Sequence, residues 1–202
     1  MKNGKKTFYK LFSFFAIVIV LAAALFCFRV RHGVIVKTDR TEVISREVTA
    51  YRQDDERWAK DTLGSSSFTM KSSGCLVTCI ASALSMEGTQ EVTPGELNKI
   101  FSENNVYDSE GNIQWSAIEN IGGYSVNVYS DVDEQVIYQW LSEGHYPIVR
   151  VRVSGIGNWH YVLVVGLEDK EYICMDPWKN ELTKLSQYLN RVYAVRVVSS
   201  IL

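Results

Sequence analysis

Cys75, His160 and Asp176 are the residues of this sequence whose types together could carry nucleophilic catalysis. A thiol attacks a carbonyl carbon as its thiolate, and an imidazole oriented by a carboxylate can take up the proton and later return it. The sequence contains only three histidines. His32 adjoins a long apolar run, and His145 lies in a glycine-containing turn, where an exposed histidine is the ordinary explanation. His160 begins the apolar run HYVLVVG, where a polar ring needs a partner.

Cys75 begins the segment CLVTCIASALSMEG, in which apolar residues recur at helical spacing and Gly88 predicts the end of a helix. Ser72 or Ser73 can cap this helix. Because a helix N-terminus lowers the pKa of a thiol, the position suits a nucleophile. A buried and inert thiol is the ordinary alternative for a cysteine in an amphipathic helix, and Cys79, one turn further along, fits that alternative better.

A register argument connects His160 to Asp176. If the strands around them form a hairpin with a three-residue loop at 168–170, Val162 lies opposite Asp176. His160 is then its diagonal neighbour on the same face of the sheet. A two-residue loop would place the two side chains on opposite faces. Pro177 ends the strand directly after the carboxylate. An aspartate that only caps a turn is the alternative.

Helices are expected before strands along the chain. The capping box Thr93-Pro94-Gly95-Glu96 predicts a second helix through Phe101, and further helices are predicted at 113–121 and 134–141. Strand-like runs follow at 125–129, 147–153, 160–167, 171–175 and 191–198. This order predicts an α+β domain, with Cys75 in an N-terminal helical part and the other two residues on a C-terminal antiparallel sheet.

Residues 11–28 form an apolar run, LFSFFAIVIVLAAALFCF, that is long enough to span a bilayer as a helix. Bulky side chains occupy the end where a cleaved signal peptide has small residues, which favours an uncleaved anchor. The lysines before the run favour an outward-facing C-terminal domain and a single-pass protein of the cell membrane. We expect a cytoplasmic basic tail at 1–10, a transmembrane signal anchor at 11–30, a stalk or first strand at 31–46, and one catalytic domain at 47–202.

Composition and charge narrow the class of protein. The chain is 47% apolar and 22% charged, as expected for a folded domain with a hydrophobic segment added. Residues 33–202 carry 15 basic and 23 acidic residues, a net charge of −8, which argues against nucleic acid as a partner. No cofactor or metal is expected. A zinc site from Cys75, Cys79, His160 and Cys174 is an alternative, but the two nearest cysteines are spaced as a helical turn, unlike a zinc-binding pair.

Four stretches together resemble a known family: YRQDDERW, SSGCLVTCIASAL, YPIVRVRV and WHYVLVVGLEDKEYICMDPW. In this order they are similar to the bacteriocin-processing (double-glycine leader) peptidase-like branch of the papain superfamily, in its extracytoplasmic form, over roughly residues 48–190. The resemblance implies a papain-like cysteine peptidase fold and a Gram-positive source. It also implies Cys75 as nucleophile, His160 as base, Asp176 as orienting acid and Gln53 as side-chain donor to the oxyanion.

Two positions depart from the pattern of that family. Gln53 lies 22 positions before Cys75, whereas the family's glutamine usually lies a few residues before its cysteine. Trp159 precedes His160 where the family often has glycine, and its ring can either wall a substrate cleft or cover the core.

The resemblance implies hydrolysis of a peptide or amide bond through an acyl-thioenzyme, with a peptide or protein as substrate. A bacteriocin leader is not the expected substrate, because that role goes with a fused transporter. Two alternatives stay open: an amidase or endopeptidase directed at peptidoglycan, and a domain that binds a peptide or cell-wall component without turning it over.

Overall fold

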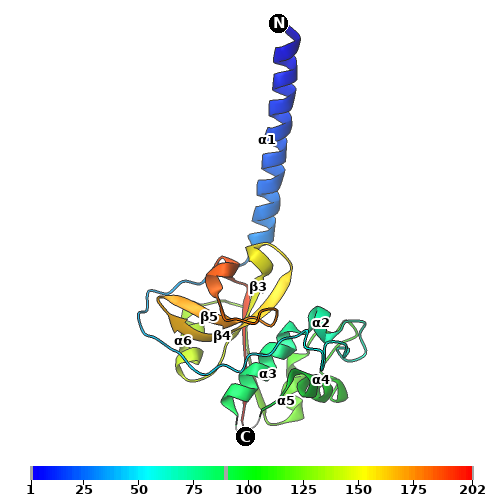
Figure 1. Cartoon of the computed structure of the whole chain (residues 1–202), viewed down its shortest axis with the longest axis vertical. Helices are drawn as coiled ribbons and strands as arrows, with labels where there is room; N and C mark the ends of the chain where they lie inside the picture. Colours follow the sequence, from blue (N-terminus) through cyan, green and yellow to red (C-terminus); the bar gives the residue numbers. More distant parts are fainter. Residues whose placement is uncertain (1, 89–90, 202) are drawn as a thin grey trace. The chain divides into compact units, whose positions relative to one another are not determined.

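The computed structural model of the chain describes residues 2–88 and 91–201, without the side chains of residues 2–10 and 13. The chain divides into two compact units, Met1–Gly33 and Val34–Leu202. The first unit contains the helix α1 (Lys2–Val30) (Figure 1). Within the described residues, no helix has both the length and the apolar character required of a membrane span. The side chains of the predicted basic tail, and that of Ser13 in the predicted anchor, lie outside the described set.

An antiparallel sheet forms one side of the second unit. Its strand order is β2-β8-β3-β4-β5-β6. The strands are β2 (Tyr124–Tyr129), β3 (Ile148–Arg152), β4 (Trp159–Glu168), β5 (Glu171–Met175), β6 (Thr183–Lys184) and β8 (Ala194–Ser200). A separate two-stranded sheet pairs β1 (Val34–Ile35) with β7 (Arg191–Val192). The run predicted as one strand at 191–198 is therefore divided at Tyr193 into β7 and β8.

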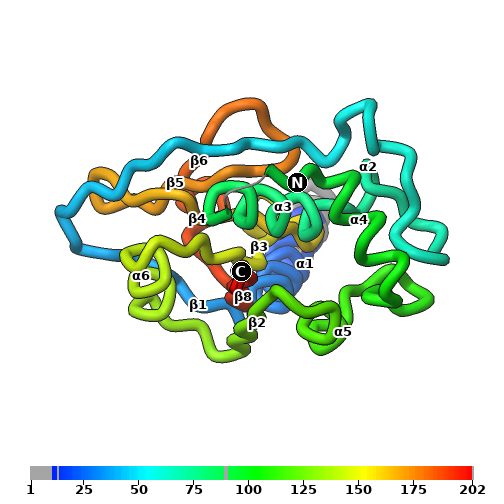
Figure 2. The backbone as a smooth tube through the Cα atoms, turned by 90° about the horizontal axis from the view of Figure 1, so that it is seen from below, coloured from blue at the N-terminus to red at the C-terminus, as the bar shows by residue number. Residues whose placement is uncertain are grey.

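Most of the helices precede the sheet in sequence. They are α2 (Met70–Ser73), α3 (Cys75–Glu87), α4 (Pro94–Glu103), α5 (Trp115–Ile121) and α6 (Glu134–Ser142), with 3-10 turns η1 (Val153–Gly155) and η2 (Leu185–Tyr188). The α+β fold with N-terminal helices and a C-terminal antiparallel sheet is confirmed. Figure 2 shows α3 running between the sheet and the helix α4, whereas α5 lies beside β2.

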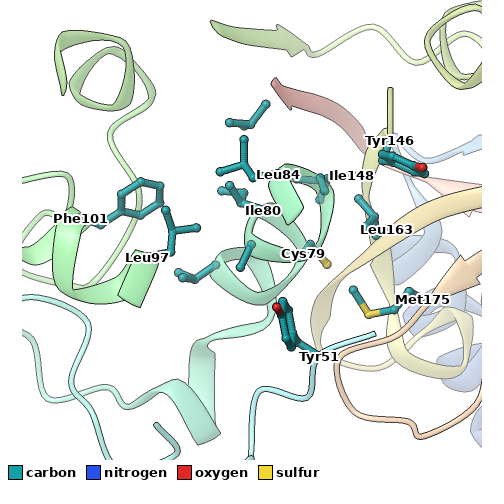
Figure 3. Packing of buried hydrophobic residues seen from close by; sticks show 14 of the residues in the cluster. Tyr51, Cys79, Ile80, Leu84, Leu97, Phe101, Tyr146, Ile148, Leu163 and Met175 are labelled. Carbon is teal, nitrogen blue, oxygen red and sulfur yellow. The ribbon is translucent and has the colours of Figure 1, made fainter. Parts of the chain in front are cut away.

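The buried helix α3 fixes the position of Cys75, its first residue. In Figure 3, Leu97 and Phe101 of α4 lie on one side of α3, and Ile148 and Leu163 of the sheet lie on the other. All four side chains are fully buried, and burial of one large apolar side chain contributes about 1.5–3 kcal/mol. The N-terminus of α3 is thus positioned by packing on both sides.

The opposite face of the sheet forms a second core. Ile137 and Leu141 of α6 pack there against Val149 and Val162. Strand β4 contributes to both cores, since Val162 belongs to this cluster and Leu163 to the first. Burial on both faces explains why β4 has a nearly continuous apolar sequence.

The segment predicted as a stalk or first strand pairs with the second unit from Val34 onward. Val36 is 1% exposed, and its N–H donates to the carbonyl oxygen of Asn190 at 2.7 Å. Ile44 forms an isolated antiparallel bridge with Leu167 of β4. Residues 34–46 are therefore bound to the two sheets at more than one place.

Candidate active site

The hairpin of β4 and β5 has a shorter loop than the sequence predicted. Glu168 pairs with Glu171, so the loop contains two residues, Asp169 and Lys170. Both adopt positive φ angles, 50° and 62°, as the central residues of a type I′ turn do. The predicted three-residue loop is wrong, and a regular two-residue hairpin would place His160 and Asp176 on opposite faces.

A β-bulge at Val165 restores the predicted side-chain arrangement. The register shifts between Val164 and Gly166, so Leu163 pairs with Met175 one position earlier than a regular hairpin would allow. Relative to β5, the extra residue moves the side chains of β4 that precede Val165 in sequence, His160 among them, to the other face of the sheet. His160 and Asp176 consequently lie on the same face, as the sequence predicted.

The Asp176 carboxylate is held by several donors. Its Oδ1 lies 2.7 Å from His160 Nε2 and accepts from the Trp178 backbone N–H at 2.9 Å. Its Oδ2 accepts from the Tyr188 hydroxyl and lies 3.8 Å from Lys179 Nζ. Burial raises the pKa of Asp176, but the bonds from His160, Tyr188 and the Trp178 N–H outweigh burial and hold that pKa below its usual value. The carboxylate is therefore ionised at neutral pH.

The His160 ring is buried, with 1% of the residue exposed, and has one nitrogen available for chemistry. Trp178 stacks on it, with ring centroids 4.2 Å apart and an interplanar angle of 22°. Nε2 is occupied by Asp176, whereas buried Nδ1 has no hydrogen-bond partner among the described residues. Burial lowers the pKa of His160, but the Asp176 carboxylate and the nearby Cys75 thiol outweigh it and raise that pKa to about 9. Since Asp176 occupies Nε2, Nδ1 is the ring nitrogen that is available to the Cys75 thiol.

Cys75 is placed by a tight junction between α2 and α3. The N-cap of α3 is Gly74, which makes no side-chain capping bond, so the predicted serine cap of this helix is wrong. Ser72 instead completes a capping box with Thr69 at the start of α2. A Cβ on Gly74 would lie 2.5 Å from the Met70 carbonyl oxygen, so the junction requires glycine.

The thiols of this unit differ in accessibility. Cys75 is partly exposed, whereas Cys79 and Cys174 are fully buried. Burial is the main cause that raises the pKa of both buried thiols above the ordinary value. The inert alternative therefore describes Cys79 and Cys174. Across the described part of the chain, no group of three or more His, Cys, Asp or Glu side chains is arranged to hold a metal ion.

Gln53 is brought close to both halves of the site by backbone contacts. Its side-chain Nε2 donates to the Lys71 carbonyl oxygen in α2 at 2.8 Å, and its backbone N–H donates to the Pro177 carbonyl oxygen at 3.1 Å. The residue is fully buried, and its Oε1 has no hydrogen-bond partner among the described residues. The long loop therefore returns Gln53 to the turn before Cys75 and to the residue after Asp176.

A cavity of about 640 Å³ opens beside Cys75. Its walls come from the loop before α2, from α3, from the 107–115 segment and from β3 and β4: Leu63, Phe68, Ser73, Cys75, Leu76, Val77, Tyr107, Glu110, Gly111, Asn112, Ile113, Trp115, Arg150 and Tyr161. Trp159 is not among these residues. It is 41% exposed, and the guanidinium groups of Arg150 and Arg152 both lie over its ring, so it neither covers the core nor lines this cavity.

Two side chains of the site had no role in the sequence prediction. Trp178 lies in the stretch that carried the family resemblance, so its position was recognisable although its stacking on His160 was not. Tyr188 reaches Asp176 from η2 across 12 residues, and no local pattern in the sequence signals that contact.

Helices precede an antiparallel sheet in this fold. Cys75 begins the helix α3, His160 lies in the sheet, and Asp176 directly follows β5. Together with the family match, this arrangement defines the class as a C39-like α+β fold. The model of the Peptidase C39 like family matches residues 45–197, and the chain belongs to that family. This membership confirms the predicted resemblance at the level of the family, while the extracytoplasmic form stays a prediction.

Among solved structures, the chain is similar to a proposed C39-like peptidase from Bacillus anthracis. The two are 14% identical, the match covers 61% of this chain and 88% of that chain, and the TM-score is 0.43. No curated protein matches the chain. The assignment therefore rests on the family match.

Proposed function

We propose that this protein is a cysteine peptidase that hydrolyses a peptide or amide bond through an acyl-thioenzyme. The observation that carries the proposal is the state of the His160 ring. Asp176 occupies Nε2 at 2.7 Å, buried Nδ1 has no hydrogen-bond partner among the described residues, and the nearby Cys75 thiol contributes to the raised pKa of the ring. An oriented imidazole beside a thiol at a helix N-terminus is the arrangement that activates a sulfur nucleophile.

In the proposed reaction, His160 Nδ1 holds the thiol proton while Cys75 Sγ attacks the carbonyl carbon. The C–N bond breaks, His160 gives the proton to the leaving amine, and the acyl group remains on sulfur as a thioester. Water then attacks the thioester and loses a proton to His160, and the acid leaves as the thiol forms again. Asp176 keeps the ring oriented and stabilises its positive charge throughout.

The oxyanion of each tetrahedral intermediate needs donors. Gln53 Nε2 has two N–H bonds, and one donates to Lys71. We assign the other, together with the backbone N–H of Cys75, to the oxyanion. Two directed donors contribute several kcal/mol to such a transition state by the usual order of magnitude.

We also propose that residues 11–30 anchor the catalytic domain to the outer face of the cell membrane. The support is the uninterrupted helix α1 and the exposure of its apolar side chains, for example Leu11 at 57% and Phe12 at 66%. A peptide outside the cytoplasm, including a cell-wall peptide, is then the substrate. Fractionation of cells that produce the full chain, followed by protease treatment of intact protoplasts, tests this placement. Recovery of the chain in the soluble cytoplasmic fraction would rule it out.

The first experiment is site-resolved alkylation of the thiols as a function of pH in the parent protein and in His160→Ala. We expect rapid labelling of Cys75 that persists below neutral pH and is lost in the variant. His145→Ala is the matched control, because the side-chain partners of His145 among the described residues, Glu87 at 3.2 Å and the ring of Trp140, lie outside the site. Slow labelling that is unaffected by His160→Ala would contradict a peptidase and favour a binding domain on the same fold.

A further inference from the structure

Two arginines share the sheet face that forms one wall of the cavity. Arg150 of β3 lines the cavity and pairs across the sheet with Tyr161 on one side and Ala194 on the other. Arg196 lies two residues beyond Ala194 in β8, so its side chain projects from the same face. Cys75 lines the same cavity, so the Arg150 guanidinium group and the proposed nucleophile border one space.

The second guanidinium group is also close to the cavity wall. Arg196 lies over the ring of Trp115, a lining residue, at 5.4 Å from its centroid. Burial lowers the pKa of Arg196, the Tyr161 hydroxyl opposes that change, and the positive charge of Arg150 adds to it. Arg150 and Arg196 are therefore near enough to repel each other.

In the described part of the chain, these charges lack an acidic partner. Among the described residues, no carboxylate forms an ion pair with Arg150 or Arg196 within 4.0 Å. The Nε atoms of both are buried without a hydrogen-bond partner. Arg196 Nη1 donates only to backbone carbonyl oxygens, those of Tyr129 and Val195, at 2.8 Å. Glu110 lines the cavity but is exposed.

Uncompensated charge at this place is unfavourable. Two like charges that are partly removed from water raise the free energy of the empty site unless an opposite charge joins them. Acidic residues are abundant elsewhere in residues 33–202, where the net charge is −8. An anion that enters the cavity would supply the missing charge, and a planar guanidinium group matches a carboxylate with two parallel hydrogen bonds.

We propose that the cavity selects a substrate carboxylate near the scissile bond, with Arg150 as its hydrogen-bond donor and Arg196 as the supporting positive charge. This inference rests on the proposed peptidase function and names its substrate class. The apolar walls at Leu63, Phe68 and Trp115 would contact the carbon skeleton that carries the carboxylate. The carboxylate can belong to an aspartate or glutamate side chain or to the end of a short peptide.

The test compares matched substrates on the full chain. One pair of fluorogenic peptides differs by Glu against Gln at each position flanking the scissile bond, and the second pair by a free acid against an amide at the chain end. We expect kcat/KM to favour the acidic member of one pair by about tenfold or more, the usual size of a charge-assisted contact. The pair that shows the preference identifies the source of the carboxylate.

Arg150→Gln should abolish the preference, and Arg150→Lys should keep part of it. Arg152→Gln is the matched control, because it removes the same charge from the same strand. Like Arg150, Arg152 stacks on Trp159, but it does not line the cavity. Equal kcat/KM values within both pairs for the parent protein, or a preference unchanged in Arg150→Gln, would overturn the proposal.

A second measurement does not depend on turnover. At least one of the acids N-acetylglutamate α-amide and N-acetylalanine should protect Cys75 from alkylation. N-acetylglutamine amide and N-acetylalanine amide should not protect it, and Arg150→Gln should remove the protection. If the thiol is not activated and no peptide is cleaved, the peptidase proposal fails, but carboxylate-dependent protection still supports this site. Absence of protection by both acids would exclude it.

Discussion

The helix side and the sheet side of the candidate site are held in different ways. On the helix side, the start of α3 has no side-chain cap, and the Cys75 thiol borders an open cavity. On the sheet side, His160 and Asp176 are 1% and 2% exposed, and both carboxylate oxygens have donors. The difference implies that the Cys75 thiol contributes little to the stability of the fold, whereas the sheet side contributes more.

Substitution of Cys75 should give the largest effect on activity and almost none on stability. Cys75→Ser removes the sulfur nucleophile, and we expect kcat/KM to fall by about a thousandfold or more. The free energy of unfolding should change by less than about 0.5 kcal/mol, because the substitution replaces one small polar group by another at a partly exposed position. Peptide hydrolysis measures kcat/KM, and urea unfolding measures the free energy of unfolding. A large loss of stability would remove the contrast between the two sides.

Substitution of Asp176 should affect both activity and the pH profile. In Asp176→Asn the main interaction that raises the pKa of His160 is lost, so that pKa falls from about 9. The alkaline limb of kcat/KM, which reports loss of the imidazolium proton, should move to lower pH, and the rate should drop by about a hundredfold. Asp133→Asn, at the N-cap of α6, is the matched control. An unchanged alkaline limb would contradict the hypothesis that Asp176 raises the pKa of the catalytic base, His160.

The same shift predicts how stability depends on pH. A histidine whose folded pKa is raised stabilises the protein fully below its unfolded value, 6.5, and loses that contribution as pH rises toward about 9. The free energy of unfolding should therefore decrease over this interval in the parent protein and decrease less in Asp176→Asn. Urea unfolding at a series of pH values measures the slope, and equal slopes would contradict the assignment.

Tyr188→Phe should give the smallest effect on the reaction and a clear effect on stability. It removes the hydroxyl donor of Asp176 Oδ2 and leaves a buried acceptor short of a partner, a loss of about 1–3 kcal/mol. We expect kcat/KM to change by less than about tenfold, since His160 keeps its own bond to Asp176. Tyr172→Phe is a matched control, because its hydroxyl donates to Glu134, which water can also reach. Equal losses in the two variants would argue against a special role for the Asp176 contact.

Local sequence patterns predicted the elements well where one interaction decides the outcome. The capping box before Pro94 starts α4 as predicted, and the strand at 171–175 has the predicted bounds. The serine cap of α3 failed because Thr69 competes for Ser72 and forms the extra helix α2. Thr69 and Ser72 are both favourable N-cap residues and lie three positions apart, so sequence alone cannot choose between them.

The relation of His160 to Asp176 was predicted correctly for an incomplete reason. The predicted loop was one residue too long, and the unforeseen bulge at Val165 cancelled that error. A bulge depends on contacts outside the hairpin: a Cβ on Gly166, next to it, would lie 2.7 Å from the Ile44 carbonyl oxygen. Such a contact joins residues more than a hundred positions apart, and no hairpin rule contains it.

The pairing of residues 34–44 with the sheets also has a mechanical meaning. Tension applied at Gly33 would load the two residue pairs of β1 with β7 first, and then the bond from Val36 to Asn190. The Ile44 bridge to Leu167 and the bond from Arg46 to the Leu141 carbonyl oxygen are further attachments along the chain before Gln53. Force that enters the domain from its N-terminal side would therefore be dissipated by contacts that can break and form again, and the geometry around His160 would be strained only after they had failed.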